Sequence, residues 1–150
     1  MGKKGVPKPH IRAAALPKVV PRPKEFRPAT QTGLLRFRFN CVDIGGPWCL
    51  SEIAAHDLRS LLARLKDFES MSCTQVFAPG SEMGKIYEVA SLPSKAARDR
   101  LLELEYDDQA ELARVRINGK QRLYGFLPDR GPEFYVLWWD PRHEIWPSRP

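Results

Sequence analysis

Basic and aromatic side chains in the last third of the chain are of types that suit the chemistry of phosphate. Arg114 and Arg116 stand two residues apart, as do Arg122 and Tyr124, and His143 follows near the end of the chain. Arginine offers a planar fork of donors that fits a phosphate group, and histidine exchanges protons near neutral pH. A ribonuclease that works without a metal needs a base, an acid and cations that stabilise charge on the phosphorus oxygens. These residues could therefore form such a site.

We predict that the catalytic residues are Arg122, His143 and Tyr124. Arg122 would hold the scissile phosphate, and His143 would exchange the proton. With one candidate histidine a second proton-transfer group is needed, and Tyr124 or Lys120 would serve. The predicted substrate-binding residues are Arg114, Arg116, Lys120, Arg142 and Trp146. Trp146 or Tyr124 would hold a base. The alternative is that the arginines are merely solvated and that Trp146 packs against the chain end.

Three short strands joined by two tight turns must position these residues. Apolar and polar residues alternate over 112–117, and Asn118-Gly119 signals a hairpin turn before a second strand at 122–127. The third run, 134–139, is rich in aromatic and β-branched residues and ends at Asp140-Pro141, because proline cannot donate to the ladder. Alternate residues of a strand share a face, so arginines two residues apart should project together. We expect Arg122 and His143 to lie at the surface, on one open face of the sheet.

The rest of the sequence predicts one more strand and two helices. Alternation over 34–44 indicates a half-buried strand, and apolar spacings of three and four over 47–70 indicate an amphipathic helix. Residues 71–90 read mainly as loop, with possible strands at 73–77 and 85–90, and a second helix is expected over 93–105. We therefore predict an α+β fold in which an antiparallel sheet of about four strands carries two helices on one face.

The net charge of +6 is concentrated at the start of the chain. Residues 1–30 contain eight Lys or Arg, one acidic residue and six prolines, and we expect them to form a disordered basic extension. Residues 31–150 then form a single globular domain with a net charge of −1. The extension is either an electrostatic arm for nucleic acid or the ribosome, or a solubilising linker.

No metal, cofactor or membrane span is predicted. Cys41, Cys49 and His56 lack the spacing of zinc ligands, and an odd count of three cysteines favours a reducing cytoplasm over a disulfide framework. Five acidic residues from Glu103 to Glu111 could hold a divalent ion or a basic protein, but a solvated helix end is the simpler interpretation. The apolar runs fall short of the length that crosses a bilayer.

The segment from Arg114 to Trp146 resembles the C-terminal sheet of the RelE/ParE toxin superfamily. The resemblance is carried by RVRINGKQRLY (114–124), FYVL (134–137) and HEIW (143–146). In that family a strand, a glycine turn and a strand with arginine and tyrosine precede a hydrophobic strand and a terminal basic segment. The resemblance implies a RelE-like fold. Asp140 and the two tryptophans before it depart from the ordinary family ending. Asp140 would either orient His143 or simply cap the turn.

Members of that family are mostly mRNA endonucleases, and some inhibit DNA gyrase. The resemblance thus implies a toxin-like endoribonuclease that cleaves mRNA without a metal and blocks translation, with the ribosome and a cognate antitoxin as candidate partners. The alternatives are a non-catalytic module that binds RNA or the ribosome, and a ParE-like gyrase inhibitor. Growth arrest with cleaved transcripts would favour the first function, salt-sensitive RNA binding alone the second, and inhibited supercoiling the third.

Overall fold

The computed structural model describes residues 33–147, which form five strands, three α-helices and three 3-10 turns. The strands are β1 (Arg36–Arg38), β2 (Gly84–Glu88), β3 (Glu111–Asn118), β4 (Gln121–Phe126) and β5 (Glu133–Asp140). The helices are α3 (Ala55–Phe68), α4 (Cys73–Val76) and α5 (Lys95–Glu103), and the 3-10 turns are η1 (Leu50–Glu52), η2 (Val89–Ser91) and η3 (Pro128–Arg130). The predicted basic extension, residues 1–30, lies outside the described residues.

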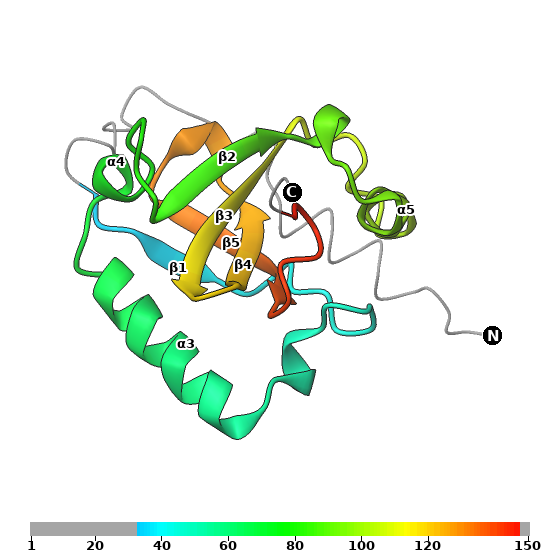
Figure 1. The fold of residues 1–150 in the computed structure, drawn as a ribbon. Helices are drawn as coiled ribbons and strands as arrows, with labels where there is room; N and C mark the ends of the chain where they lie inside the picture. Colours follow the sequence, from blue (N-terminus) through cyan, green and yellow to red (C-terminus); the bar gives the residue numbers. More distant parts are fainter. Residues whose placement is uncertain (1–32, 148–150) are drawn as a thin grey trace.

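The strands form one sheet in the order β1-β5-β4-β3-β2 (Figure 1). The predicted three-stranded meander is confirmed, because β3, β4 and β5 pair antiparallel in sequence order. Two details of the prediction are wrong: β1 pairs in parallel with β5, and β2 adds a fifth strand beside β3. A parallel pair needs a long crossover connection, which the chain between β1 and β5 supplies, and residue alternation carries no information about strand direction.

Helices cover both faces of the sheet, which corrects the prediction that both pack on one face (Figure 1). The core under α3 and α4 includes Leu61, Phe68, Cys73, Val76, Val115 and Leu123, and the core under α5 includes Ala97, Leu101, Leu112, Tyr124, Trp138 and Ile145. The central strands carry apolar side chains on both faces. A single layer of helices would leave one of these faces in water, so the fold needs both layers.

Local sequence signals explain where two helices form. α3 begins later than predicted, because Ile53 and Ala54 have extended backbones that separate it from η1. α4 (Cys73–Val76) forms where a strand over 73–77 was one possibility. A reciprocal capping box between Ser72 and Gln75 satisfies two backbone amides there and favours a helical turn.

A bulge in β5 decides which core each of its side chains enters. The register with β4 shifts just before Gly125, so that Leu137 and Trp138 both belong to the core under α5, whereas Trp139 belongs to the other core. A Cβ added at Gly125 would lie 2.2 Å from the carbonyl oxygen of Tyr135. The close approach of the two backbones at the bulge therefore requires glycine.

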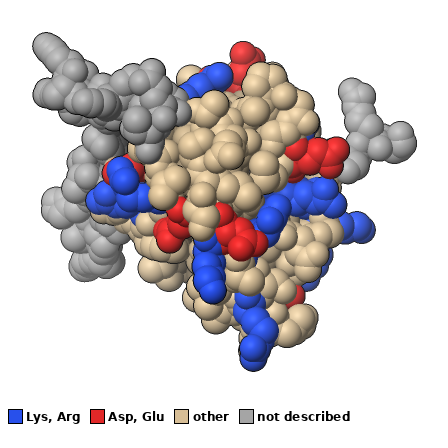
Figure 2. Space-filling model, turned by 90° about the vertical axis from the view of Figure 1, so that its left-hand side faces the viewer, with Lys and Arg blue, Asp and Glu red and all other residues tan. Residues whose placement is uncertain are grey.

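The outer surface on the α3 side carries charges of both signs. Figure 2 shows Lys and Arg interspersed with Asp and Glu around a broad uncharged area. The pair Arg64–Asp67, separated by 3.8 Å on α3, is one example. A nucleic-acid backbone would meet carboxylates as well as cations here, so the described residues on this side form no basic stripe of the kind that electrostatic binding needs. Within residues 33–147, no helix has the length and apolar character required to cross a membrane.

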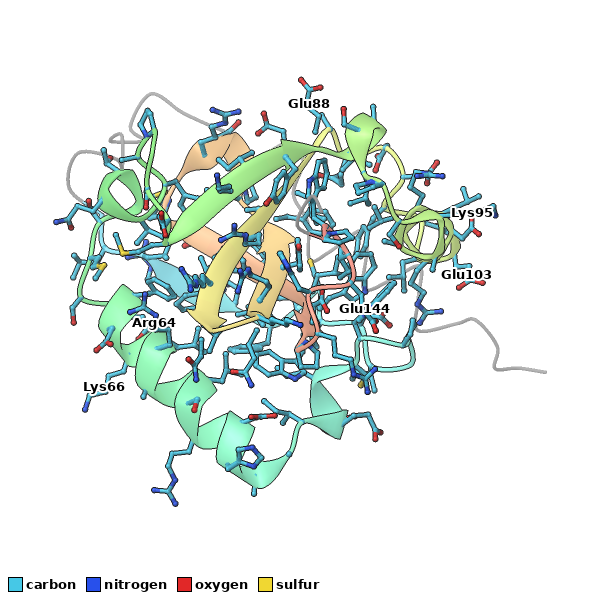
Figure 3. The ribbon with its side chains drawn as sticks, in the orientation of Figure 1. Arg64, Lys66, Glu88, Lys95, Glu103 and Glu144 are labelled. Carbon is cyan, nitrogen blue, oxygen red and sulfur yellow. The ribbon has the colours of Figure 1, made fainter. Side chains whose placement is uncertain are left out.

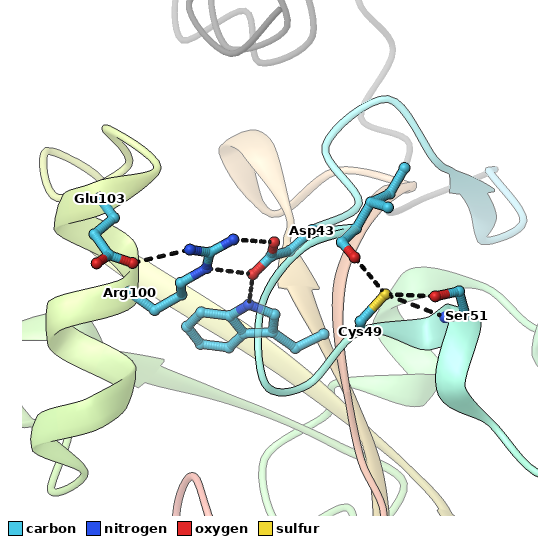
Figure 4. Close-up of polar contacts among 7 residues, drawn as sticks. Asp43, Cys49, Ser51, Arg100 and Glu103 are labelled. Atoms are coloured by element: carbon cyan, nitrogen blue, oxygen red, sulfur yellow. Dashed lines mark hydrogen bonds and ion pairs between the residues drawn. The ribbon is translucent and has the colours of Figure 1, made fainter. Parts of the chain in front are cut away.

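A buried carboxylate ties α5 to the sheet (Figure 4). Asp43 is 3% exposed and accepts hydrogen bonds from Nε and Nη2 of Arg100 at 2.9 and 2.7 Å and from Nε1 of Trp138 at 2.9 Å. Arg100 also pairs with Glu103 at 2.9 Å. Burial would raise the pKa of Asp43, but the hydrogen bonds from Arg100 and Trp138 outweigh it and lower the pKa below 3.8.

Replacing Arg100 with Met should lower the free energy of unfolding by about 3 kcal/mol at pH 7, because the change leaves Asp43 buried and unpaired. The folded pKa of Asp43 is lowered, so this stabilisation is present above the unfolded pKa of about 3.9 and is lost as the pH falls through the folded value. Urea unfolding from pH 7 to pH 3 should show the gap between the two proteins narrowing in acid. Equal stability at pH 7 would contradict the role of the pair.

Candidate phosphate-binding site

Cations from three neighbouring strands meet on the face of the sheet that α5 covers. Arg116 of β3 stands opposite Arg122 of β4, which in turn stands opposite Asp140 of β5. In the next row, Lys85 of β2 stands opposite Arg114 of β3. Directly opposed residues share a face of a sheet, so these side chains project to the same side. We refer to Arg114, Arg116 and Arg122 as the arginine cluster.

Two members of the arginine cluster are buried with unused hydrogen-bond donors. Arg114 is 6% exposed and Arg122 is 9% exposed, which corrects the expectation that Arg122 lies at the surface. Nε and Nη1 of Arg114 and Nε of Arg122 have no hydrogen-bond partner. Neither residue forms an ion pair with any carboxylate of residues 33–147. A buried and unpaired charge is costly, so these donors are ready to bind an anion.

The other contacts of the arginine cluster leave most of its positive charge uncompensated. Nη1 of Arg122 donates to the carbonyl oxygens of Gly119 and Gln121 at 2.6 and 3.1 Å, and Arg116 pairs with Glu82 at 3.4 Å at an exposed position. Burial lowers the pKa of Arg122, and the charges of the other two cluster members lower it further. An anion placed among the three guanidinium groups would relieve this repulsion.

His143 lies on the segment that follows β5, three residues after Asp140, which stands opposite Arg122 of the arginine cluster. Burial lowers the pKa of His143, and Arg122, Arg114 and Lys120 lower it further, whereas Asp140 raises it. The net shift below 6.5 keeps the imidazole neutral at pH 7, which is the form that accepts a proton. The structure therefore brings the predicted pair, Arg122 and His143, within electrostatic reach of each other.

Tyr124 lies next to the arginine cluster but inside the core. It stands between Arg114 and Trp138 in the sheet and is 0% exposed, and its hydroxyl has no hydrogen-bond partner. The expectation that Tyr124 holds a base is therefore wrong, because no surface of the ring is accessible. Burial raises the pKa of Tyr124, so the phenol keeps its proton and also lacks access to the leaving oxygen. Of the two predicted proton-transfer partners for His143, the structure favours Lys120, which is exposed in the β3–β4 turn.

The remaining predicted binding residues lie around the rim of the site. Trp146 is half-buried and stacks on Tyr87 of β2, with ring centroids 4.0 Å apart and an interplanar angle of 12°. It therefore fastens the chain end, as the alternative interpretation held. Arg142 is exposed and pairs with Glu144 at 3.5 Å. Figure 3 shows Glu144 on the C-terminal segment beside the sheet, whereas Lys66 extends outward from α3.

Sequence reasoning missed the contribution of β2 to the site. Lys85 and Tyr87 project to the same face as the arginine cluster, because they stand opposite Arg114 and Leu112. The alternation of Lys85, Ile86 and Tyr87 was the available signal, but a strand of five residues between loops does not reveal which edge it joins.

Other candidate sites are weaker. In the acidic segment, Glu111 forms an ion pair with Arg130, and no group of three or more His, Cys, Asp and Glu residues among 33–147 could hold a metal ion. A groove of about 450 Å³ is lined by residues such as Ala113, Leu127 and Asp129 and includes no member of the arginine cluster. All three cysteines are buried with free thiols.

No protein-family model, no curated protein and no solved structure matches this chain. Its function must therefore be inferred from the geometry of the arginine cluster and His143.

Replacing Arg114 or Arg122 with Met should raise the free energy of unfolding in phosphate-free buffer by on the order of 1 kcal/mol, because a buried unpaired charge is removed while the apolar stem is kept. Phosphate should raise the melting temperature of the wild type but not of either variant, since a ligand stabilises the state that binds it. Arg59→Met, at an exposed position on α3, is the matched control and should keep the phosphate response. Melting curves in phosphate and in chloride at equal ionic strength measure both effects. A full phosphate response in both cluster variants would contradict the site.

Proposed function

We propose that this protein is a toxin-like endoribonuclease that binds an RNA phosphate at the arginine cluster and cleaves the chain without a metal. One observation carries the proposal: two buried arginines hold unused donors beside a histidine whose pKa is lowered. A structural role alone does not account for these donors, because structural buried arginines are normally paired and fully hydrogen-bonded. A phosphate supplies the negative charge and the acceptor oxygens that they lack.

The arrangement supports transfer of phosphorus from the 5′-oxygen to the neighbouring 2′-oxygen of RNA. Neutral His143 takes the proton of the 2′-hydroxyl, and the 2′-oxygen forms a bond to phosphorus. The bond from phosphorus to the 5′-oxygen breaks, and the Lys120 ammonium gives that oxygen a proton. Arg114 and Arg122 stabilise the negative charge that grows on the phosphorus oxygens in between. The products are a 2′,3′-cyclic phosphate and a 5′-hydroxyl end, and DNA is excluded because it has no 2′-hydroxyl.

The resemblance to the RelE/ParE superfamily supports the same reaction class and suggests the ribosome and an antitoxin as partners. Buried free thiols fit a reducing compartment such as the cytoplasm. The burial of Tyr124 favours one second candidate, a non-catalytic RNA-binding module, because it removes one of the two groups that could pair with His143 in proton transfer. Both candidates use the arginine cluster for phosphate and differ only in whether the bond is broken.

Cleavage of a single-stranded RNA by the purified full chain, alone and with ribosomes, tests the proposal. His143→Ala should reduce the rate by about 10²- to 10⁴-fold, the range for a general acid or base, and Arg122→Met by about 10²- to 10³-fold, the range for one charge stabiliser. Chelator should leave the rate unchanged, and the products should carry 2′,3′-cyclic phosphate.

DNA of the same sequence and the Arg59→Met variant are the controls: the DNA should stay intact, and the variant should cleave RNA as the wild type does. RNA binding that depends on the arginine cluster without any cleavage would establish the binding module instead. Full activity of both site variants would refute the assignment.

A further inference from the structure

The carboxylate of Asp140 holds the turn that carries His143. Asp140 ends β5 and is 0% exposed. Its Oδ1 accepts a hydrogen bond from the backbone amide of Glu144 at 3.0 Å, and its Oδ2 accepts one from the amide of Ile145 at 2.8 Å. Both oxygens of a single buried carboxylate thus fix the two residues that directly follow His143.

Further contacts fasten the same segment beyond the turn. Ile145 is 0% exposed in the core under α5, and the side chain of Glu144 accepts a hydrogen bond from Nε1 of Trp48 at 3.3 Å. The stacking of Trp146 on Tyr87 ties the end of the segment to β2. The chain is therefore held at Asp140 on one side of His143 and at three successive residues on the other side.

His143 itself adopts an unusual backbone conformation, which the contacts on either side of it must maintain. Its φ is 60°, in the left-handed region that residues other than glycine seldom adopt. Such a conformation persists only where the surrounding structure over-determines it. The two hydrogen bonds that Asp140 accepts close the turn around His143 and hold its backbone in this conformation.

The charge of Asp140 also matters at this place, because it acts on the imidazole against three cations. Arg122 on β4, Arg114 on β3 and Lys120 in the turn between these strands all lower the pKa of His143, whereas Asp140 on β5 raises it. On the segment itself, Arg142 and Glu144 pair with each other. Removing the charge of Asp140 would take away a carboxylate that opposes the charges of Arg122, Arg114 and Lys120 at the imidazole.

We propose that Asp140 is a positioning residue for His143: its two hydrogen bonds fix the turn so that the imidazole stays beside Arg122, and its charge offsets the arginine cluster. The role in RNA cleavage rests on the proposed function, whereas the positioning of the ring does not. Asp140→Asn keeps the size of the side chain, but its amide group can accept only one of the two backbone donors. The turn around His143 should therefore loosen.

The first test follows the His143 ring by NMR titration and needs no substrate. In Asp140→Asn the pKa of His143 should fall below its wild-type value, because a carboxylate that raises it has lost its charge. Asp43→Asn is the matched control, since it removes another buried carboxylate, one that bonds Arg100 and Trp138, and it should leave the His143 titration unchanged. An unchanged pKa in Asp140→Asn, or an equal shift in the control, would overturn the proposal.

The second test uses RNA cleavage and separates positioning from general damage. Asp140→Asn should lower kcat by roughly 10²-fold with little change in KM, as expected for a misplaced catalytic group, and the acid limb of the pH profile should move to lower pH. In a His143→Ala background the same change should have no further effect, because Asp140 acts through His143. An additive loss in the double variant would overturn the proposal.

A third measurement covers the case in which Asp140→Asn fails to fold. In the wild type, hydrogen exchange at the amides of Glu144 and Ile145 should be as slow as in the centre of β5, because both amides donate to a buried carboxylate. Fast exchange at both amides would overturn the positioning role. A wild type that shows protection and the expected His143 titration, but no RNA cleavage, would refute the proposed function and leave the positioning intact.

Discussion

The register between β4 and β5 is the constraint on which the site depends. Pairing of Arg122 with Asp140 brings the carboxylate to the same face as the arginine cluster and starts the segment that carries His143. A strand has a side-chain period of two, so a slip by one residue would move every side chain of β5 to the opposite face. The bulge before Gly125 is part of this register, because it alone allows Leu137 and Trp138 to enter the core under α5 together.

Two buried carboxylates, Asp43 and Asp140, hold segments of the chain against the face of the sheet under α5. Asp43 joins Arg100 to Trp138, and Asp140 joins the end of β5 to the two amides beyond His143. In both carboxylates, each oxygen accepts a hydrogen bond from another group of the protein. The arginine cluster differs, because three of its buried N–H groups have no hydrogen-bond partner. The protein thus satisfies its buried anions and leaves its buried cations partly unsatisfied, an imbalance that a phosphate would correct.

The sequence predicted the parts of the fold that depend on local signals. The Asn118-Gly119 turn and the alternation around it placed Arg122 and Tyr124 on one face, and this arrangement is confirmed. Burial was not predictable in the same way, because it depends on α5 and on the segment around Ile145, which reach the sheet from elsewhere in the chain. The bulge could not be predicted either. A bulge is visible in a sequence as a break in the alternation of polar and apolar residues, and the apolar run Leu137-Trp138-Trp139 has no such alternation.

The parallel pairing of β1 with β5 has a consequence for how the chain folds. Arg36 and Phe37 find their partners in Glu133 and Phe134, so the first strand joins the sheet only through residues that are made much later than the strand itself. Contacts of such large sequence separation are slow to form, because the loop between them must close first. During synthesis the chain therefore emerges with β1 unpaired. β1 joins the sheet only when β5 is present, and the segment that carries His143 follows β5 directly. The arginine cluster and His143 can therefore meet only after the ribosome has made β5 and the segment that follows it.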